Sequence, residues 1–461
     1  MMKYLNSMFS AAMLCLICAP TFATDLMESW HAAQSHDPEF AAAQANFEAM
    51  MTHREQSRGI WLPSVGLTVG AGIGSAASET TGAQFSAPGF NQSTGVSFDT
   101  SIRRGEMTQY ALVARQPLLN RTLLTQSRQL ALSADMAEIE WRAARQQLAL
   151  RVAERYFDVL IASETLRQLL QQQTAIEFTL SETRDRFKFG SIPITDTYEA
   201  SARAETVRAQ IMAAEMDLQI KQSMFADLTG ISGERLLPLN RPTDRPTVNL
   251  PSLDACIRDA LLNNPELLVQ AKKLAIAEDE AEKHRALNSP SLDVIAQVGH
   301  ERLHGNGDYG GAENSASNRM IGIQLTIPLY TGGIRSAKYS EAVHLIDKAK
   351  FDSELLKQKI VTQVRTNWLG VTVGESRLMA LSQAHKASLA RLEATRLGHS
   401  VGDRTTLDLL NAENDVTNSA LALLQENIHV HLNKLKLAQL VGSLDETVLS
   451  DTNALLVSEK N

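Results

Sequence analysis

The chain has 461 residues, of which 44% are hydrophobic and 5% aromatic, and its formal net charge is −8. At roughly 150 residues per domain this length corresponds to two to four domains, and the acidic balance disfavours nucleic acid as the main partner. A mean hydropathy of −0.15, with no apolar run of about 18 residues after the start, excludes a polytopic helical membrane protein.

The N-terminal segment 1–23 has the composition of a secretory signal peptide. Lys3 precedes an apolar stretch over 8–19, and a small-x-small cleavage site ends the segment. A lipoprotein would need a small residue just before the modified cysteine, but Leu14 and Ile17 stand at those positions. The sequence therefore predicts an exported chain without a lipid anchor.

The mature chain contains an internal repeat. Asp37-Pro-Glu recurs as Asn264-Pro-Glu at an offset of 227, and Leu228-Thr-Gly recurs as Leu440-Val-Gly at an offset of 212. The two halves therefore share one plan and differ mainly in one loop. The predicted domains are the signal peptide over 1–23, a first repeat over 24–237, a Pro-rich linker over 238–251, a second repeat over 252–442 and a C-terminal tail over 443–461.

Each repeat is predicted to contain one very long helix followed by a shorter one. Proline is absent from 118–192, where apolar or small residues recur at spacings of three and four. A helix over 118–188 would measure roughly 100 Å. The same pattern predicts helices over about 195–230, 333–400 and 405–442. Helices of this length cannot bury themselves in one globule, so they must pack as a bundle or a cylinder.

Two segments, about 62–117 and 290–329, each contain a predicted pair of strands. Their apolar residues alternate with small or polar ones, as in the run from Val65 to Ile73 and the run from Ile321 to Ile327. Each strand is about ten residues long, which is the length of a tilted transmembrane β-strand. Polar loops over about 75–106 and 300–318 are expected to join each pair.

Four strands are too few to close a barrel. An open strand edge in lipid leaves backbone groups unpaired, at a cost of several kcal/mol each, and single-chain barrels begin at about eight strands. If these strands span a membrane, several chains must contribute to one barrel. The alternative is a four-stranded sheet that packs against helices in water.

Four stretches, together with their duplication, give the chain a recognisable family likeness. They are Asp37-Pro-Glu through Leu62-Pro-Ser, Gln-Leu-Thr-Ile-Pro-Leu-Tyr-Thr-Gly-Gly at 324–333, Arg-Phe-Lys-Phe-Gly-Ser-Ile-Pro-Ile-Thr-Asp at 186–196 and Gly-His-Ser-Val-Gly-Asp-Arg-Thr-Thr-Leu-Asp at 398–408. In order and spacing they resemble the TolC family of outer-membrane factors over essentially the whole mature chain. The resemblance implies a mixed, mainly α fold, with a long α-helical barrel joined to a trimeric twelve-stranded transmembrane β-barrel and four strands per chain.

The resemblance also implies a function and a location. The chain would form a homotrimeric, non-enzymatic channel-tunnel in the outer membrane, in contact with its lipid, with the helical part in the periplasm. It would give passive exit to substrates of a tripartite efflux pump or a type I secretion system. A periplasmic adaptor protein and an inner-membrane pump or ABC transporter would open it. The transported substrate is left open, because drugs, metal ions and secreted proteins all fit.

The family narrows its tunnel at the periplasmic end of the helices, and the resemblance assigns that gate to particular residues of this chain. The corresponding positions are Thr195, Asp196, His399, Arg404, Asp408 and Asn411. By resemblance, Asp196 would pair with Arg404. Either Thr195 or Asp196 would contact His399.

By the same resemblance, Asp408 would form a ring of three carboxylates across the trimer. Two departures from the family pattern stand beside it. Asn411 replaces a second Asp, which predicts weaker cation selectivity, and His399 replaces a Tyr. Because an imidazole titrates near neutral pH, we hypothesise that His399 makes opening sensitive to pH.

The same residues also fit a simpler interpretation as helix caps. Thr195 and Asp196 follow Pro193, where a helix should begin, and Thr405-x-x-Asp408 has the spacing of a capping box. A carboxylate there is favoured by the positive end of the helix dipole. Capping and gating are compatible, so both remain open.

The spacing and position of the other candidate residues do not fit a dinucleotide, metal or catalytic site. Gly70, Gly72 and Gly74 lie inside an alternating strand and lack the spacing of a dinucleotide site. His300 and His304 lie in a polar loop, so no metal site is predicted. The sequence indicates no cofactor and no catalytic set. The alternative function is a non-conducting periplasmic coiled-coil adaptor, which would need one helical hairpin flanked by small β domains.

Overall fold

A computed structural model describes residues 23–239, 250–286, 290–308 and 310–456 of the chain. The predicted signal peptide, except residue 23, and most of the predicted linker lie outside these residues. The chain divides into two compact units. The helical unit comprises Met1–Phe47, Glu138–Val269 and Ser353–Asn461, and the strand unit comprises Glu48–Ala137 and Gln270–Asp352.

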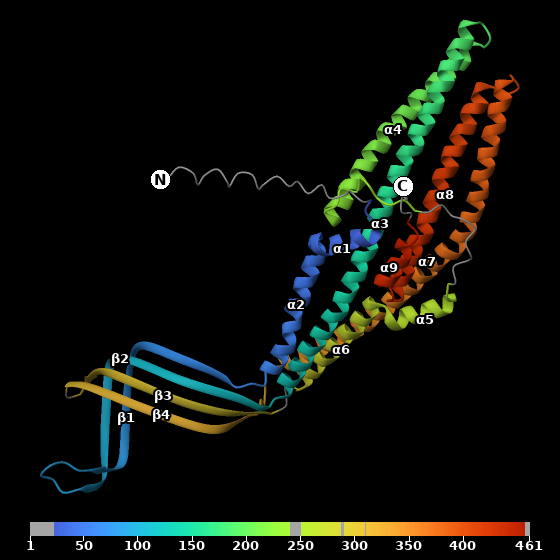
Figure 1. Cartoon of the computed structure of the whole chain (residues 1–461). Coiled ribbons are helices and arrows are strands. Elements are labelled where there is room, and N and C mark those ends of the chain that lie inside the picture. The colour runs from blue at the N-terminus through green and yellow to red at the C-terminus, as the bar shows by residue number, and fades with distance from the viewer. Residues whose placement is uncertain (1–22, 240–249, 287–289, 309, 457–461) are drawn as a thin grey trace, which may run out of the picture. The chain divides into compact units, whose positions relative to one another are not determined.

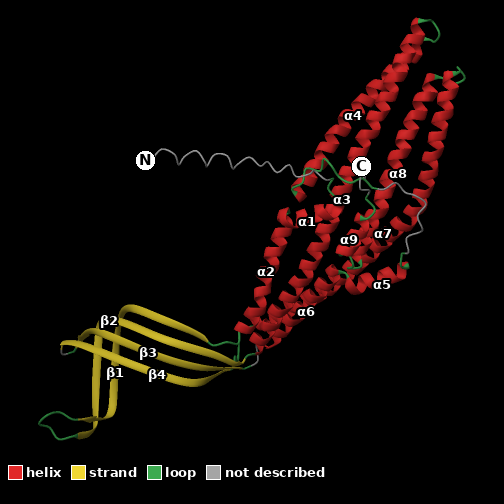
Figure 2. Ribbon diagram, viewed as in Figure 1, coloured by secondary structure: helices red, strands yellow, loops and turns green. Residues whose placement is uncertain are grey.

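Figure 2 shows helices as the main secondary structure. The helices of the described residues are α1 (Leu26–His36), α2 (Pro38–Gly59), α3 (Arg121–Lys188), α4 (Ile194–Thr229), α5 (Leu253–Asn263), α6 (Pro265–Ala286), α7 (Ile334–Ser400), α8 (Thr406–Leu440) and α9 (Glu446–Asn453). The last of these, α9, lies in the predicted C-terminal tail. Its Leu449 is fully buried in the largest hydrophobic cluster, so this segment is part of the packed core.

The strand unit holds one antiparallel sheet with the strand order β1-β2-β3-β4 (Figure 1). Its strands are β1 (Ser64–Phe85), β2 (Ser93–Leu119), β3 (Ser291–Gly307) and β4 (Gly310–Thr326). The expectation of ten-residue strands joined by long polar loops is wrong, because most of 75–106 and 300–318 is strand. An alternation of apolar and polar residues can identify only that part of a strand in which one face is apolar. Beyond it, polar cross-strand pairs continue the ladder, for example Arg302 Nε with Glu313 Oε1 at 2.7 Å.

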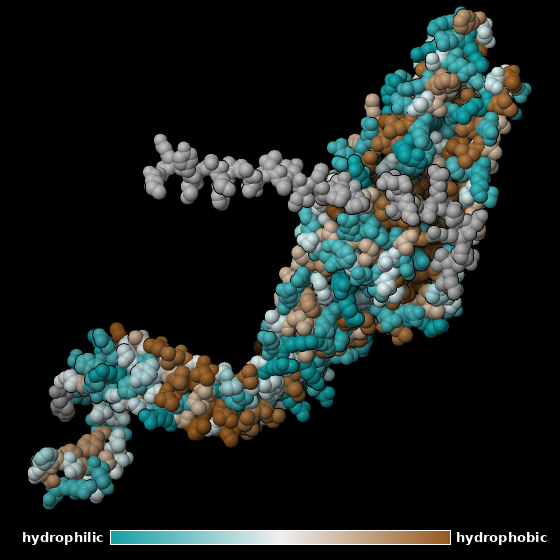
Figure 3. Space-filling view, in the orientation of Figure 1, coloured by the Kyte–Doolittle hydropathy of each residue, from teal (hydrophilic) through white to brown (hydrophobic). Residues whose placement is uncertain are grey.

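One face of the sheet is apolar near the helix-proximal ends of the strands. In the register, Leu67 lies opposite Leu112, and Leu112 lies opposite Val298. Residues that face each other in a sheet share one side of it. Large apolar side chains on this side are exposed: Val65, Leu67, Val69, Ile73, Leu112, Val298, Ile321, Ile323 and Leu325. Figure 3 shows hydrophobic side chains gathered over this part of the strands.

The repeated Asx-Pro-Glu motif begins a helix in each half. Asp37 Oδ2 accepts a hydrogen bond from the backbone N–H of Phe40 at 3.1 Å at the start of α2. Asn264 Oδ1 accepts from the N–H of Leu267 at 3.2 Å at the start of α6. Proline occupies the first helical position in both cases, where its missing N–H costs nothing. The repeat detected in the sequence is therefore, at this point, a repeated helix start.

Two glycines inside α7 permit close packing of α7 against α8. A Cβ placed on Gly370 would lie 2.5 Å from Asn433 Nδ2, and one on Gly374 would lie 2.7 Å from Val430 Cγ2. In isolation a glycine weakens a helix by about 1 kcal/mol relative to alanine. Here the small residue allows the neighbouring helix to approach.

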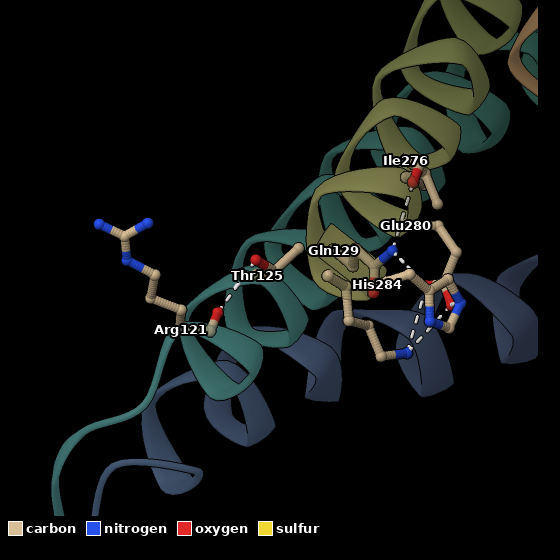
Figure 4. A network of polar contacts seen from close by, with 7 residues as sticks. Arg121, Thr125, Gln129, Ile276, Glu280 and His284 are labelled. Atoms are coloured by element: carbon tan, nitrogen blue, oxygen red, sulfur yellow. Dashed lines mark hydrogen bonds and ion pairs between the residues drawn. The ribbon is translucent and has the colours of Figure 1, made fainter. Parts of the chain in front are cut away.

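A network of polar side chains joins α3 and α6 in the strand unit (Figure 4). Gln129 donates to Glu280 Oε2 at 2.8 Å and to the carbonyl of Ile276 at 3.3 Å. Glu280 also contacts Lys283 at 3.2 Å and His284 Nε2 at 3.0 Å. Burial opposes ionisation of Glu280, but the bonds from Gln129 and Lys283 outweigh it and lower its pKa.

Candidate functional site

The two turns that contain the predicted gate residues have the same backbone structure. They join α3 to α4 and α7 to α8, and Figure 1 shows both at the same end of the helical unit. Gly190 and Gly402 end the two long helices with φ of 72° and 85°. A left-handed residue at this place favours glycine, which has no Cβ.

The hydrogen bonds of the two turns match as well. Ser191 N donates to Arg186 O at 2.9 Å, and Gly190 N donates to Phe187 O at 2.8 Å. In the second half, Asp403 N donates to Gly398 O at 2.8 Å, and Gly402 N donates to His399 O at 3.1 Å. Each set is a Schellman motif, which pairs carbonyls that a helix end otherwise leaves open.

The helices that follow these turns begin differently. Thr405 caps α8, because its Oγ1 accepts from Asp408 N at 3.1 Å while Asp408 Oδ2 accepts from Thr405 N at 3.1 Å. This reciprocal pair is the capping box that the sequence suggested. At the same place in the first half, Pro193 precedes α4 and makes no side-chain cap bond. Asp196, the counterpart of Asp408 in the repeat, is therefore not used in a cap.

The carboxylate of Asp408 is held in its charged form. The backbone N–H and the hydroxyl of Thr405 both donate to it, and these bonds lower its pKa. The positive charges of Arg404 and Arg391 act in the same direction. Asp408 is half-buried, and Asn411 is exposed less than one turn further along α8.

Asp196 contacts the opposite hairpin through a residue that the sequence analysis did not name. Thr406 Oγ1 donates to Asp196 Oδ2 at 3.4 Å, across 210 positions of the chain. His399 Nε2 lies 3.4 Å from the same Thr406 Oγ1, and both His399 and Thr406 are buried. The expected link between Asp196 and His399 is thus bridged by a hydroxyl. Thr195 Oγ1 lies 3.4 Å from Asp196 Oδ1 on the other side.

One signal in the sequence could have identified Thr406. At the repeat offset of 212 it corresponds to Ile194, so a hydroxyl stands where the first half has an apolar side chain. A polar residue at an otherwise apolar repeat position indicates a polar contact specific to that half.

Arg404 is exposed and covers the end of α7. A Cβ placed on Gly398 would lie 2.7 Å from Arg404 Cγ, so the glycine makes room for the arginine stem. Within the described ranges, no ion pair joins Arg404 to Asp196. The pairing of these two residues therefore stays a prediction.

The hairpins are packed together just beyond the turns. A hydrophobic cluster from α3, α4 and α8 contains Ile176, Ala200, Val207 and Leu410, all nearly fully buried. Glu413 follows on α8 and is also buried, with Arg396 Nη2 at 3.5 Å from its Oε1. Its Oε2 has no hydrogen-bond partner among the described residues. Burial raises the pKa of Glu413, and the charge of Arg396 only partly opposes this effect.

The other candidates from the sequence are not brought together as a site. His300 Nδ1 lies 2.9 Å from Ser317 Oγ, and Asp308 pairs with Arg103 at 2.9 Å. Over the described part of the chain, no group of three or more His, Cys, Asp or Glu side chains is placed to hold a metal ion. Among the same residues, no helix has the length and apolar character needed to cross a bilayer.

Comparison with protein families places nearly the whole chain in one group. The family model described as "Outer membrane efflux protein" matches residues 30–231 and 256–443. The outer membrane protein TolC of Vibrio cholerae is 27% identical over 464 residues, which is 100% of both chains. The alkaline protease secretion protein AprF of Pseudomonas aeruginosa is 26% identical and covers 99% of this chain and 92% of its own length.

Solved structures share the fold at lower identity. The Campylobacter jejuni CmeC outer membrane channel superposes with a TM-score of 0.71 at 16% identity, covering 94% of this chain and 90% of its own. A structure of CusC gives a TM-score of 0.70 at 16% identity, covering 92% and 93%. The resemblance inferred from the sequence and the mainly helical, four-stranded fold class are both confirmed.

Proposed function

The chain belongs to the outer membrane efflux protein family, and from this premise we propose that three copies form one passive exit duct for a tripartite efflux pump or a type I secretion system. As a member of that family the protein is a non-enzymatic efflux or secretion channel of the outer membrane. Beyond this function, we propose that the channel is a trimer, that the duct has a closed state and that partner proteins open it.

The observation that supports the trimer is the sheet with two open edges. Among the residues that the structure describes, its order β1-β2-β3-β4 leaves β1 and β4 each with one side that pairs with no other strand. In hydrocarbon, each unpaired backbone group costs several kcal/mol, so only a closed barrel is stable there. Pairing β4 of one chain with β1 of the next removes both edges. Three chains give twelve strands, within the known range of outer-membrane barrels.

The chemistry of the two sheet faces supports the same assembly. The exposed apolar face carries side chains such as Leu67, Leu112 and Val298, which would face lipid. The opposite face carries small or polar residues such as Gly70, Gln109 and Glu301, which suit a water-filled lumen. This alternation is typical of membrane barrels.

We assign the closed end of the duct to the two turns of the helical unit. The contact from Asp196 through Thr406 to His399 would hold the two hairpins of one chain together. Arg404, which is exposed in the single chain, would be available to a neighbouring subunit. Asp408 of three subunits would narrow the entrance, and Asn411 would add no charge to it.

The family implies a tripartite assembly, and we propose its periplasmic and inner-membrane components by class. A periplasmic adaptor protein and an inner-membrane pump or ABC transporter would engage the hairpin turns and separate them. Among the relatives, two are named for protease secretion and one for efflux. Both kinds of cargo are therefore proposed for this chain.

Fractionation followed by planar-bilayer recording tests the proposal. We expect the mature protein in the outer-membrane fraction, as a detergent-soluble trimer that forms stable, low-conductance channels. A water-soluble protein without channel activity would favour the non-conducting adaptor instead. The hypothesis that His399 makes opening pH-sensitive is tested on the same channels across about pH 5 to 8. A flat profile that His399→Tyr leaves unchanged would contradict it.

A further inference from the structure

A cavity of about 440 Å³ lies in the strand unit, and none of the predicted gate residues lines it. It is lined by the end of α6, the connection that follows β4 and the first turns of α7. Three of its lining residues, His284, Arg285 and Arg335, carry or can carry positive charge. In the part of the chain that the structure describes, no aspartate or glutamate lines it. The cavity is therefore suited to an anion.

The two arginines have unused hydrogen-bonding capacity. Arg335 Nε is buried and has no hydrogen-bond partner in the described ranges. The ion pair that Arg285 makes with Glu282 is long, at 3.9 Å, and three quarters of the Arg285 side chain is exposed. A guanidinium matches the oxygens of a phosphate group with two parallel N–H donors. Leaving a buried donor without an acceptor is costly, so an anion here would satisfy it.

The imidazole of His284 is fixed in orientation by the network shown in Figure 4. Its Nε2 lies 3.0 Å from Glu280 Oε1, and Glu280 is held in turn by Gln129 and Lys283. The other nitrogen, Nδ1, is buried without a hydrogen-bond partner among the described residues. In its protonated form the imidazole donates from both nitrogens. His284 can then donate from Nδ1 to a bound anion.

The residue types around the cavity are those typical of a membrane–water boundary. Tyr330 and Tyr339 line it, and Leu329 beside them is 92% exposed. Ile323 and Leu325 of β4 are exposed at the alternating positions that lead toward Leu329. Tyrosine is enriched where hydrocarbon meets water. An acyl chain along this apolar row would bring a headgroup to the cavity.

We propose that this cavity binds a phosphate group, which Arg285, Arg335 and His284 hold. A phospholipid of the membrane leaflet that faces the periplasm and free phosphate in the periplasm share this chemistry. The exposed apolar row favours the lipid. The lipid source rests on the proposed insertion of the strands, whereas the phosphate site itself does not.

Native mass spectrometry of the detergent-solubilised trimer tests the site. The probes are dioleoyl phosphatidylglycerol and, separately, inorganic phosphate. The test variant is Arg285→Gln with Arg335→Gln. A matched control, Arg365→Gln with Lys359→Gln, removes two exposed charges of α7 that do not line the cavity. Loss of two charge-assisted contacts should weaken binding by about tenfold or more, while the control keeps wild-type affinity.

Each outcome decides one part of the proposal. Lipid binding that falls in the test variant supports the lipid source. If phosphate binding falls in the test variant, and the wild type binds the lipid no more tightly than it binds phosphate, the site is supported with free phosphate as its source. Equal binding of both probes by the wild type, test variant and control overturns the site. The variant Arg285→Lys with Arg335→Lys keeps both charges, so it should retain part of the affinity. If it does, the loss of binding in the glutamine variant does not come from misfolding. Channel conductance is recorded separately, so failure of the duct and failure of the site are distinguishable.

Discussion

Asp196 and Asp408 occupy the same position in the two repeats but make different contacts. Asp408 closes a capping box with Thr405, three residues before it. Asp196 follows a proline that offers no cap, and it accepts a hydrogen bond from Thr406 of the other hairpin. The replacement of a hydroxyl residue by proline at one N-cap therefore converts a local helix contact into a contact between hairpins.

Replacing Thr406 by Val should open the closed duct. The substitution keeps the shape of the side chain but removes the hydroxyl between Asp196 and His399, so the two hairpins lose their polar link. We expect single-channel conductance in planar bilayers to rise about twofold or more, because the buried His399 and the half-buried Asp196 lose the hydroxyl that joins them in the closed state. Thr366→Val is the matched control, since Thr366 is exposed and bonds only within its own helix. Unchanged conductance in Thr406→Val would remove Thr406 from the gate.

Arg404→Ser tests whether a neighbouring subunit uses this arginine. Within the chain Arg404 is exposed, so its loss should leave the stability of a single hairpin unchanged. If it pairs with Asp196 across subunits, conductance should rise, and the rise should shrink at high salt because exposed ion pairs are screened. Arg391→Ser serves as the control, because Arg391 pairs with Asp415 on the next helix of its own chain. A wild-type conductance in Arg404→Ser would refute the pairing with Asp196.

Thr405→Ala should loosen the start of α8 and leave α4 as it is. The substitution removes the cap hydroxyl that accepts from Asp408 N, and loss of an N-cap costs about 1 kcal/mol. Hydrogen exchange should therefore accelerate about fivefold at the first amides of α8. The comparison is Thr195→Ala in the first half, where the hydroxyl makes only a 3.4 Å contact with Asp196. Equal protection in both variants would mean that the capping box contributes nothing.

Glu413→Gln should stabilise the protein most at neutral and higher pH. The pKa of Glu413 is raised by burial, so its contribution to stability is present at low pH, where the folded and unfolded forms are both protonated. That contribution is lost as the pH rises through the raised pKa of the folded form. We expect the midpoint of thermal unfolding to rise by about 2 °C at pH 8 and to change little at pH 4. Glu393→Gln on the exposed side of α7 is the control. A larger gain at pH 4 than at pH 8 would contradict the assignment.

Gly374→Ala should destabilise the contact between α7 and α8, although alanine is the better helix former. Helix propensity favours the change by about 1 kcal/mol, whereas overpacking costs about 1 to 3 kcal/mol. The added Cβ would lie 2.7 Å from Val430, so the steric cost should exceed the gain. Gly59→Ala adds a Cβ where nothing lies within 4 Å, and it should not destabilise the protein. Chemical denaturation of the two variants decides between the effects.

The amino-acid sequence was sufficient to predict the family, the repeat, the long helices and the strand pairs, but not α9. Period-two and helical spacing, together with proline placement, are local properties of the chain, and they predict strands and helices without reference to distant contacts. The strand lengths could not be read in the same way, because beyond the apolar face the ladder continues through polar pairs such as Arg302 with Glu313. Alternation of hydrophobicity carries no signal there.

The tertiary structure decided how the gate residues are connected. Thr405 with Asp408 is a contact over three residues, so its capping box could be predicted from spacing. Asp196 with Thr406 is a contact over 210 residues, and its existence depends on how α4 packs against α8. The packing around α8 also buries Glu413 and raises its pKa. The close approach of α7 to α8 requires the small residues Gly370 and Gly374. Burial and long-range distance are properties of the folded arrangement, and no local pattern in the chain encodes them.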